Sequence, residues 1–362
     1  MNRKYVWIFG ACVILIISTI TAFYRVPNRH EVKSMTFPFE KKYNTDEAVG
    51  PFAVSPDRRI IAWIAAPQII DSNLNILKLD NGAATSLNSG DKSRTYGIAI
   101  SPDGTILVAG VNKISGNCLL QIWDLRKYTF QKEIDVGKGF MTSIIFAKDG
   151  KSVYVGNECG DGILRRIDIE SGKTEEVFGP QNKNDLPRNS DLSINSIALS
   201  SDGQILAIGL RTGVIVWNLK FNSVRFSIKD EKRATTTLAF SPDGKRLAVG
   251  GYSTGLWDVE TGKIISDITI DGQSICVAKI LFSPDSKFLV ASLNSAINFP
   301  SKVAVWRIDD YSHPFSYYCH KDVTRAISFM PGTNKLVTGS DDCSICIWDL
   351  DKLSWPKEKD EK

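Results

Sequence analysis

The chain has 362 residues, of which 43% are hydrophobic and 23% are charged, so it can bury one large core or two ordinary ones. Its formal net charge of +4 at pH 7 is small for this length and comes without a block of basic residues, which argues against a nucleic-acid partner. The chain has three histidines, whereas zinc sites usually draw on clustered His and Cys, so we expect no metal, no other cofactor and no enzyme activity.

The first predicted element is a transmembrane helix within residues 1–24. Residues 5–24 carry no charge over 20 positions. At about 1.5 Å per residue, a helix of this length matches the roughly 30 Å hydrocarbon core of a bilayer. Arg3 and Lys4 precede the run, Arg25 follows it, and aromatic residues lie near both of its ends. The sequence therefore predicts a single-pass membrane protein that is anchored through residues 5–24.

Two alternatives to an uncleaved anchor stay open. Ile20-Thr21-Ala22 approximates a signal-peptide cleavage site, and the position of Cys12 hints at a lipoprotein box. Basic residues are similar in number on the two flanks, so the positive-inside rule does not fix the orientation. The short N-terminal flank resembles that of signal anchors, and we therefore expect the large domain on the extracytoplasmic side.

The rest of the chain repeats one pattern seven times. Each copy has an apolar run, a tight-turn signal such as Ser-Pro-Asp-Gly, and a second apolar run. Successive copies begin 41 to 53 residues apart, close to the roughly 40–45 residues of a four-stranded propeller blade. The copies begin at Val54, Ile100, Phe146, Leu199, Phe240, Phe282 and Phe329.

The fifth copy indicates how one repeat folds. Strands are predicted at 235–241 and 246–251, joined by Pro242-Asp243-Gly244, in which Pro presets φ and Gly accepts a positive φ. Further strands are predicted at 256–259 and 263–270. Such a meander cannot bury both of its apolar faces alone, so the copies must stack, and a radial arrangement leaves only short sheet edges. We therefore predict an all-β, seven-bladed β-propeller of four-stranded antiparallel blades, preceded by the transmembrane helix.

Each copy ends in a variant of the theme Ile-Trp-Asp-Leu. The first and third copies place Leu77 and Ile167 in the register that holds Trp elsewhere, so the slot is apolar throughout. The tryptophans that share this register are Trp123, Trp217, Trp257, Trp306 and Trp348.

This pattern resembles the WD-repeat family. The last copy carries the resemblance most fully, because His320, Thr338, Asp342 and Trp348 stand at the spacing of the hydrogen-bonded tetrad of family blades. The resemblance implies a blade-stabilising network at these four residues. The other six copies lack the full tetrad.

The resemblance also implies that a strand from the N-terminal end closes the ring against the last blade. Residues 33–40 are the candidate, although Pro38 confines such a strand to an edge position. The predicted divisions are the anchor at 1–24, a linker with this possible strand at 25–45, the propeller at 46–355 and a charged tail at 356–362.

The motifs that suggest chemistry have structural explanations, and we predict no catalytic residue. Cys343 and Cys346 form a C-x-x-C pair, but residues three apart on a strand point to opposite faces, and no second Cys pair completes a zinc site. His320 and Asp342 resemble an acid–base pair, yet the tetrad accounts for both. The six cysteines after the predicted helix are expected to be buried thiols, although an even count also permits disulfides.

Binding is expected on one rim of the ring. The copies differ mainly in the connections between their second and third strands and between blades, which emerge on the same rim, and loops on a rigid scaffold commonly carry binding. Apolar residues in these polar loops either anchor a partner or tuck under their own loops; they are Ile69, Ile70, Ile297 and Phe299.

We therefore predict a membrane-tethered, non-enzymatic scaffold that docks partner proteins on this rim, as the family resemblance implies. The alternative is an exported propeller, similar to the TolB type in its repeated turns, that binds a small molecule or metal at the central channel. A propeller enzyme with its site in that channel is part of the same alternative.

Overall fold

The computed structural model describes residues 39–65, 73–88, 94–113, 116–158, 162–179, 193–229, 235–270, 273–274, 276–293, 301–309 and 315–353. The predicted transmembrane helix, its two alternatives and the predicted tail at 356–362 lie outside these residues. Within the described residues, no helix is long and apolar enough to cross a membrane.

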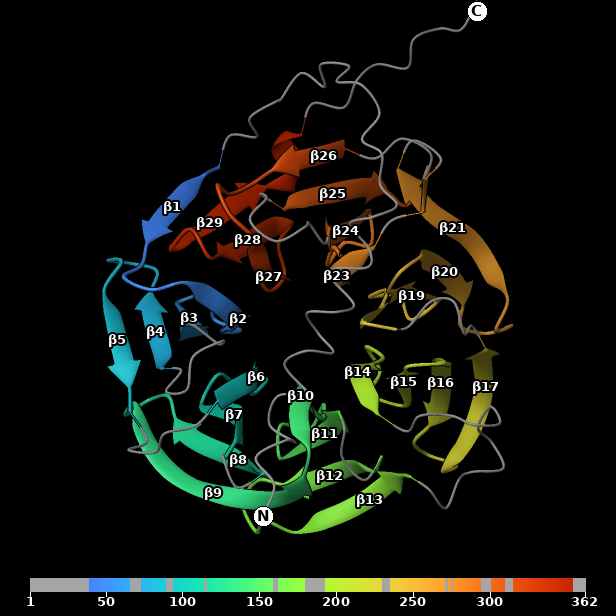
Figure 1. Cartoon of the computed structure of the whole chain (residues 1–362), viewed down its shortest axis with the longest axis horizontal. Coiled ribbons are helices and arrows are strands. Elements are labelled where there is room, and N and C mark those ends of the chain that lie inside the picture. The colour runs from blue at the N-terminus through green and yellow to red at the C-terminus, as the bar shows by residue number, and fades with distance from the viewer. Residues whose placement is uncertain are drawn as a thin grey trace, which may run out of the picture.

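The strands form seven sheets that surround a common centre (Figure 1). Consecutive strands pair antiparallel, and in blades 1 to 6 they follow chain order from the centre outward. The predicted seven-bladed propeller of four-stranded antiparallel blades is therefore confirmed. Blades 1 to 3 comprise β2 (Val49–Val54), β3 (Ile60–Ala65), β4 (Leu74–Lys78) and β5 (Ala84–Leu87); β6 (Arg94–Ile100), β7 (Ile106–Asn112), β8 (Asn117–Asp124) and β9 (Thr129–Lys138); and β10 (Phe140–Phe146), β11 (Ser152–Glu158), β12 (Leu164–Asp168) and β13 (Thr174–Phe178).

The second half of the chain continues the same order and adds one short strand to blade 5. Blades 4 to 6 comprise β14 (Ile194–Leu199), β15 (Ile205–Leu210), β16 (Gly213–Asn218) and β17 (Ser223–Lys229); β18 (Thr237–Phe240), β19 (Arg246–Gly250), β20 (Thr254–Asp258), β21 (Ile264–Ile270) and β22 (Gln273–Ser274); and β23 (Val277–Phe282), β24 (Phe288–Leu293), β25 (Lys302–Arg307) and β26 (Phe315–Tyr318). Blade 7 comprises β27 (Thr324–Phe329), β28 (Lys335–Ser340), β29 (Ser344–Asp349) and β1 (Lys41–Asn44), and the 3-10 helix η2 (Leu350–Lys352) follows it.

The repeated turn signal joins the first and second strands of each blade. In five blades a Ser hydroxyl at the start of the turn donates to the Asp carboxylate two residues later, as Ser241 Oγ does to Asp243 Oδ1 at 2.5 Å. The same carboxylate accepts the backbone N–H of the residue two positions further on, here Lys245 at 3.0 Å. These bonds satisfy polar groups inside a tight turn, which explains why Ser-Pro-Asp recurs along the sequence.

The apolar slot of each copy lies on the third strand of its blade and packs against the preceding blade. Trp217 of blade 4 pairs with Leu206 and belongs to the buried cluster that includes Tyr154 of blade 3. Leu77 and Ile167 occupy the corresponding registers in blades 1 and 3, so the prediction that they replace the Trp is confirmed. Each interface between blades is thus a continuous apolar core.

Blade 7 is built from both ends of the chain. Its outer strand is β1, which pairs with β29, and Tyr43 of β1 is buried with its hydroxyl donating to the carbonyl of Leu79 at 2.9 Å. The predicted closing segment, 33–40, is described only at its end, where Phe39 lies edge-on to Trp348 at 5.8 Å. The closing strand therefore lies just after the predicted segment. Every residue of Lys41–Asn44 has a backbone N–H for the ladder, whereas Pro38 has none.

Candidate functional site

The structure brings the four residues of the predicted tetrad together inside blade 7. Trp348 Nε1 donates to Thr338 Oγ1 at 2.8 Å, and the same oxygen lies 2.7 Å from His320 Nε2. His320 Nδ1 lies 3.1 Å from Asp342 Oδ1. A neutral His320 that carries its proton on Nδ1 satisfies every hydrogen bond of the tetrad. Its Nε2 then accepts from the Thr338 hydroxyl, and its Nδ1–H donates to the Asp342 carboxylate.

The Asp342 carboxylate is the charged end of this network. Burial alone would raise its pKa, but hydrogen bonds from His320, Ser344 and the backbone N–H of Lys321 outweigh that effect and hold the pKa of Asp342 well below its ordinary value of 3.8. The network ties the connection between β26 and β27, where His320 lies, to β28 and β29. These hydrogen bonds account for all four residues without a substrate.

Other blades keep the Trp without its partner. The position of Thr338 is held by Ala109 in blade 2 and by Ile208 in blade 4. The indole N–H groups of Trp123 and Trp217 have no hydrogen-bond partner among the described residues. Apolar packing, rather than a polar network, therefore holds the tryptophans of those two blades.

The predicted rim residues cannot be placed. Ile69, Ile70, Ile297 and Phe299 all lie outside the described residues. The structure describes the strands on either side of these connections, which are β3 and β4 in blade 1 and β24 and β25 in blade 6.

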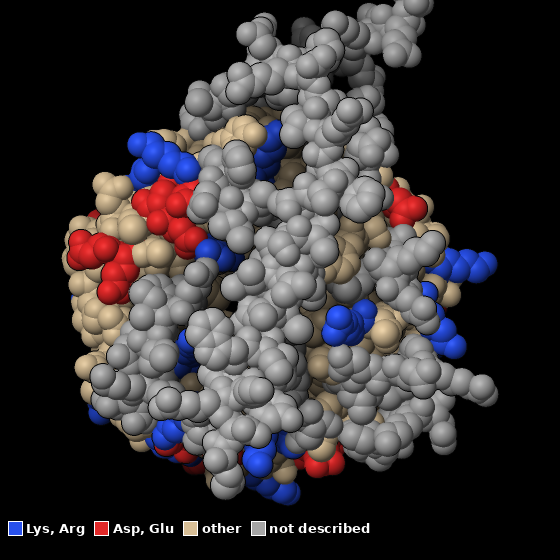
Figure 2. Space-filling model, in the orientation of Figure 1, with Lys and Arg blue, Asp and Glu red and all other residues tan. Residues whose placement is uncertain are grey.

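The two faces of the ring differ in how uniform their connections are. The seven turns between first and second strands are all five residues long, and they share one face with the connections between third and fourth strands, which have four to seven residues. On the opposite face, the connections between second and third strands have 2 to 8 residues, and those between blades have 1 to 15. We call these the constant face and the variable face. Where the structure describes charged side chains on the face viewed in Figure 2, both signs are interspersed.

The innermost strands carry little titratable chemistry. β2, β6, β10, β14, β18, β23 and β27 contain three charged residues, Arg94, Lys279 and Arg325, and no Asp, Glu or His. Arg325 is held by Asp341 through an ion pair at 2.6 Å. Within the described residues, no group of three or more His, Cys, Asp or Glu side chains could hold a metal ion.

The C-x-x-C pair is split between two environments. Cys343 lies in the turn between β28 and β29 with a φ of 57°, whereas Cys346 is buried in β29, and the five described cysteines are free thiols. Cys118 is buried as expected. Cys276, Cys319 and Cys343 are only partly buried, so the expectation of uniformly buried thiols is wrong; Cys343, for example, lies in a surface turn.

Comparison with known proteins matches two blades to a family. Residues 85–124 and 312–349 match the family described as WD domain, G-beta repeat. Each match runs from the outer strand of one blade through the first three strands of the next, and the second contains the tetrad of blade 7. Two stretches of this seven-bladed propeller therefore match WD repeats.

The relatives of this propeller are distant, and each is longer than the part that matches. It is 26% identical over 133 residues to nuclear distribution protein nudF of Aspergillus flavus, a match that covers 36% of this chain and 28% of that protein. It is 27% identical over 152 residues to a guanine nucleotide-binding protein subunit beta of Nicotiana tabacum, covering 40% and 39%. A WD repeat-containing protein, SL1-17 of Schistosoma mansoni, is 31% identical over 164 residues, covering 44% and 51%. The chain thus matches between about a quarter and a half of each relative's length.

One solved structure shows the same fold over nearly the whole chain. A chain in the crystal structure of the mitotic checkpoint complex superposes with a TM-score of 0.70, covering 91% of this chain and 97% of that chain at 17% identity. Propellers of this family typically serve as protein-interaction scaffolds and are generally not enzymes.

Proposed function

We propose that the protein is a membrane-tethered, non-enzymatic scaffold that docks partner proteins on its variable face. The observation that carries this proposal is the contrast between the two faces. Seven turns of identical length on one face and connections of 1 to 15 residues on the other are expected when a rigid ring presents loops that have diverged for binding.

The candidate anchors on this face are Ile69, Ile70, Ile297 and Phe299, which are apolar residues in polar connections. Large apolar side chains supply much of the energy at protein interfaces when they enter a pocket of the partner. Residues 5–24 would hold the ring close to a bilayer, with the propeller on the extracytoplasmic side. A partner in or near the membrane fits this placement.

The docking proposal is tested by chemical crosslinking in native membranes followed by pull-down. The variable-face variant changes Ile69, Ile70 and Phe299 to Asp. The matched control is Ile265→Asp, because Ile265 is 47% exposed on the outer strand β21, away from the variable face. We expect a reproducible partner with the wild type and the control, and its loss in the variable-face variant. Equal capture by all three proteins would refute docking through these residues.

The tether is tested separately by deleting residues 1–24. We expect the full chain to resist alkaline extraction from membranes and the shortened chain to be released. Protease accessibility in sealed vesicles then reports which side the propeller occupies. Release of the full chain by alkali would contradict the transmembrane anchor.

A further inference from the structure

Blade 3 differs from the other six at the surface that it presents to the next blade. In each blade one cross-strand pair of the second and third strands packs under the apolar slot of the following blade. In six blades this pair is aliphatic: Ala62 and Ile76, Val108 and Ile122, Ala207 and Val216, Ala248 and Leu256, Val290 and Val305, and Val337 and Ile347. In blade 3 the pair is Tyr154 and Arg166.

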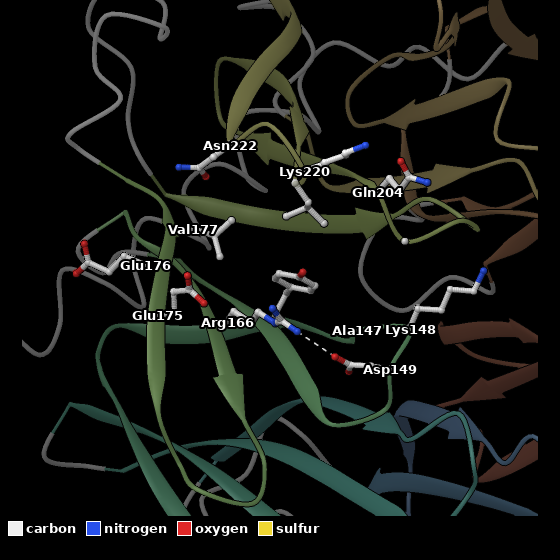
Figure 3. Close-up of a pocket in the computed structure, with 13 residues that line it drawn as sticks. Ala147, Lys148, Asp149, Arg166, Glu175, Glu176, Val177, Gln204, Lys220 and Asn222 are labelled. Carbon is white, nitrogen blue, oxygen red and sulfur yellow. Dashed lines mark hydrogen bonds and ion pairs between the residues drawn. The ribbon is translucent and has the colours of Figure 1, made fainter.

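This substitution coincides with an enlarged groove between blades 3 and 4. The groove has a volume of about 770 Å³, against about 550, 470 and 580 Å³ for the grooves between blades 2 and 3, 4 and 5, and 5 and 6. Figure 3 shows Glu175 and Glu176 of β13 on one side of it, and Lys220 and Asn222 of blade 4 on the other. The groove opens on the constant face, because turns of that face line it.

The cations around this groove are already engaged. Arg166 Nη2 pairs with Asp149 at 2.9 Å (Figure 3), and its Nε donates to Ser152 Oγ at 2.9 Å. Lys148 donates to the carbonyl of Ser201 at 2.8 Å, and the ammonium of Lys220 lies 5.5 Å from the centre of the Phe221 ring.

Apart from Asp149, the carboxylates of the groove and the Tyr154 hydroxyl have no hydrogen bond or ion pair with the described residues. Glu175 lies directly opposite Arg166 on the neighbouring strand, yet the guanidinium turns to Asp149. Neither Glu175 nor Glu176 takes part in a hydrogen bond or ion pair with the described residues. Tyr154 is 6% exposed, and its hydroxyl has no hydrogen-bond partner among the described residues. Burial raises the pKa of Tyr154, so this group stays a neutral phenol near neutral pH.

The groove between blades 2 and 3 has the opposite arrangement of charge. Between blades 2 and 3, Lys132 on the outer strand of blade 2 donates to the carbonyl of Glu170 of blade 3, beside Asp168. Lys132 lies opposite Ile122, which is the third-strand member of the cross-strand pair in blade 2. In blade 3 the residue opposite Arg166, at the corresponding position, is Glu175. The ammonium group of Lys132, which spans the groove between blades 2 and 3, is thus replaced by the Glu175 carboxylate in the groove between blades 3 and 4.

We propose that the groove between blades 3 and 4 binds a lysine or arginine side chain of a partner protein, with Glu175 as its counter-ion and the Tyr154 hydroxyl as a hydrogen-bond acceptor. The groove volume falls in the range of small-ligand pockets, roughly 300–1,000 Å³, so it has room for one long side chain and part of its backbone. This site lies on the constant face and is independent of docking on the variable face.

The test uses the full chain in detergent micelles, labelled with 3-fluorotyrosine, and titrates it with N-acetyl-argininamide. The chain has ten tyrosines, and the Tyr154 fluorine signal is assigned by its loss in Tyr154→Phe. We expect a saturable shift of this signal with N-acetyl-argininamide or N-acetyl-lysinamide. The neutral isostere N-acetyl-citrullinamide should give no saturable shift.

Two variants decide whether the carboxylate carries the interaction. Glu175→Gln should weaken the apparent affinity for N-acetyl-argininamide about threefold to fivefold, the size expected for one partly exposed charge pair. Glu133→Gln is the matched control, since Glu133 lies on the outer strand of blade 2 and already pairs with Lys113 at 3.2 Å; it should leave the affinity unchanged. Arg166→Ile restores the aliphatic pair of the other blades, removes a positive charge opposite Glu175 and leaves Asp149 without its ion-pair partner, so in a folded protein it should strengthen rather than weaken the binding of N-acetyl-argininamide.

Three results would overturn the proposal. The first is equal binding of the citrulline probe, and the second is an unchanged affinity in Glu175→Gln. The third is preferential binding of N-acetyl-glutamate, which would assign the groove to an anionic partner.

Discussion

The Thr338 hydroxyl in blade 7 allows a sharp test of the tetrad. Its oxygen serves both the Trp348 indole at 2.8 Å and His320 Nε2 at 2.7 Å, and the residue is fully buried. Thr338→Val keeps the shape of the side chain and removes both bonds. Each bond contributes about 1 kcal/mol net, and a buried group deprived of its partner costs about 1–3 kcal/mol, so the variant should lose about 2–4 kcal/mol of unfolding free energy.

The measurement is equilibrium urea unfolding followed by tryptophan fluorescence, with Thr324→Val as the matched control. Thr324 is also buried in blade 7, but its hydroxyl has no hydrogen-bond partner among the described residues. The same chemical change there should be neutral or slightly stabilising, because it removes an unsatisfied buried group. A Thr338→Val variant within about 0.5 kcal/mol of the wild type, or equal losses in the two variants, would refute the network as a source of stability.

Three further predictions concern pH, ring closure and packing. The folded-state pKa of Asp342 lies below its unfolded value of 3.8, so its contribution to stability is present above about pH 4 and is lost as the pH falls further. Asp342→Asn should therefore be less stable than the wild type at pH 7, and its stability should depend less on pH below 4. Urea unfolding across this pH range measures both effects. Deleting residues 1–38 should leave the melting temperature of the ring nearly unchanged, whereas deleting residues 1–46 removes β1 and should lower it markedly in calorimetry; equal melting temperatures would contradict closure by β1. Gly209→Ala would place a β-carbon 2.7 Å from Thr235 Cγ2, so it should cost about 1–3 kcal/mol in urea unfolding, and a neutral effect would show that the interface between blades 4 and 5 can relax.

The features of the fold that could be predicted are those that each blade repeats locally. The Ser-Pro-Asp turns depend on contacts within about five residues, so the sequence reveals them directly. Leu77 and Ile167 could be placed in the Trp slot because strand register fixes which face a residue takes. Both signals survive in blade 1, where the Trp-Asp pair is lost.

The closing strand and the blade 3 groove depend on partners far away in the sequence. Lys41–Asn44 pairs with β29, and four polar or aromatic residues give no local strand signal. The signal for the groove was the charged residue Arg166 in the third strand of blade 3, where the other blades are aliphatic. Its meaning depends on Tyr154 across the ladder and on the packing of the next blade, neither of which local sequence specifies.

The positions of the tetrad and of ring closure fit together physically. Blades 1 to 6 are each one continuous segment of chain, so the covalent connections between neighbouring strands limit how far a blade can open. Blade 7 has no such connection between β29 and β1. Among the described residues, ladder bonds, the buried Tyr43 and the contact of Phe39 with Trp348 join this end of the chain to β29, and the Glu40–Lys335 ion pair at 2.7 Å joins it to β28. The tetrad joins β28 and β29 to the connection that precedes β27. It therefore stabilises blade 7, the blade whose outer strand could separate without distorting a covalent connection. Blades 2 and 4, closed by their own chain, can keep a Trp without an acceptor for its indole N–H.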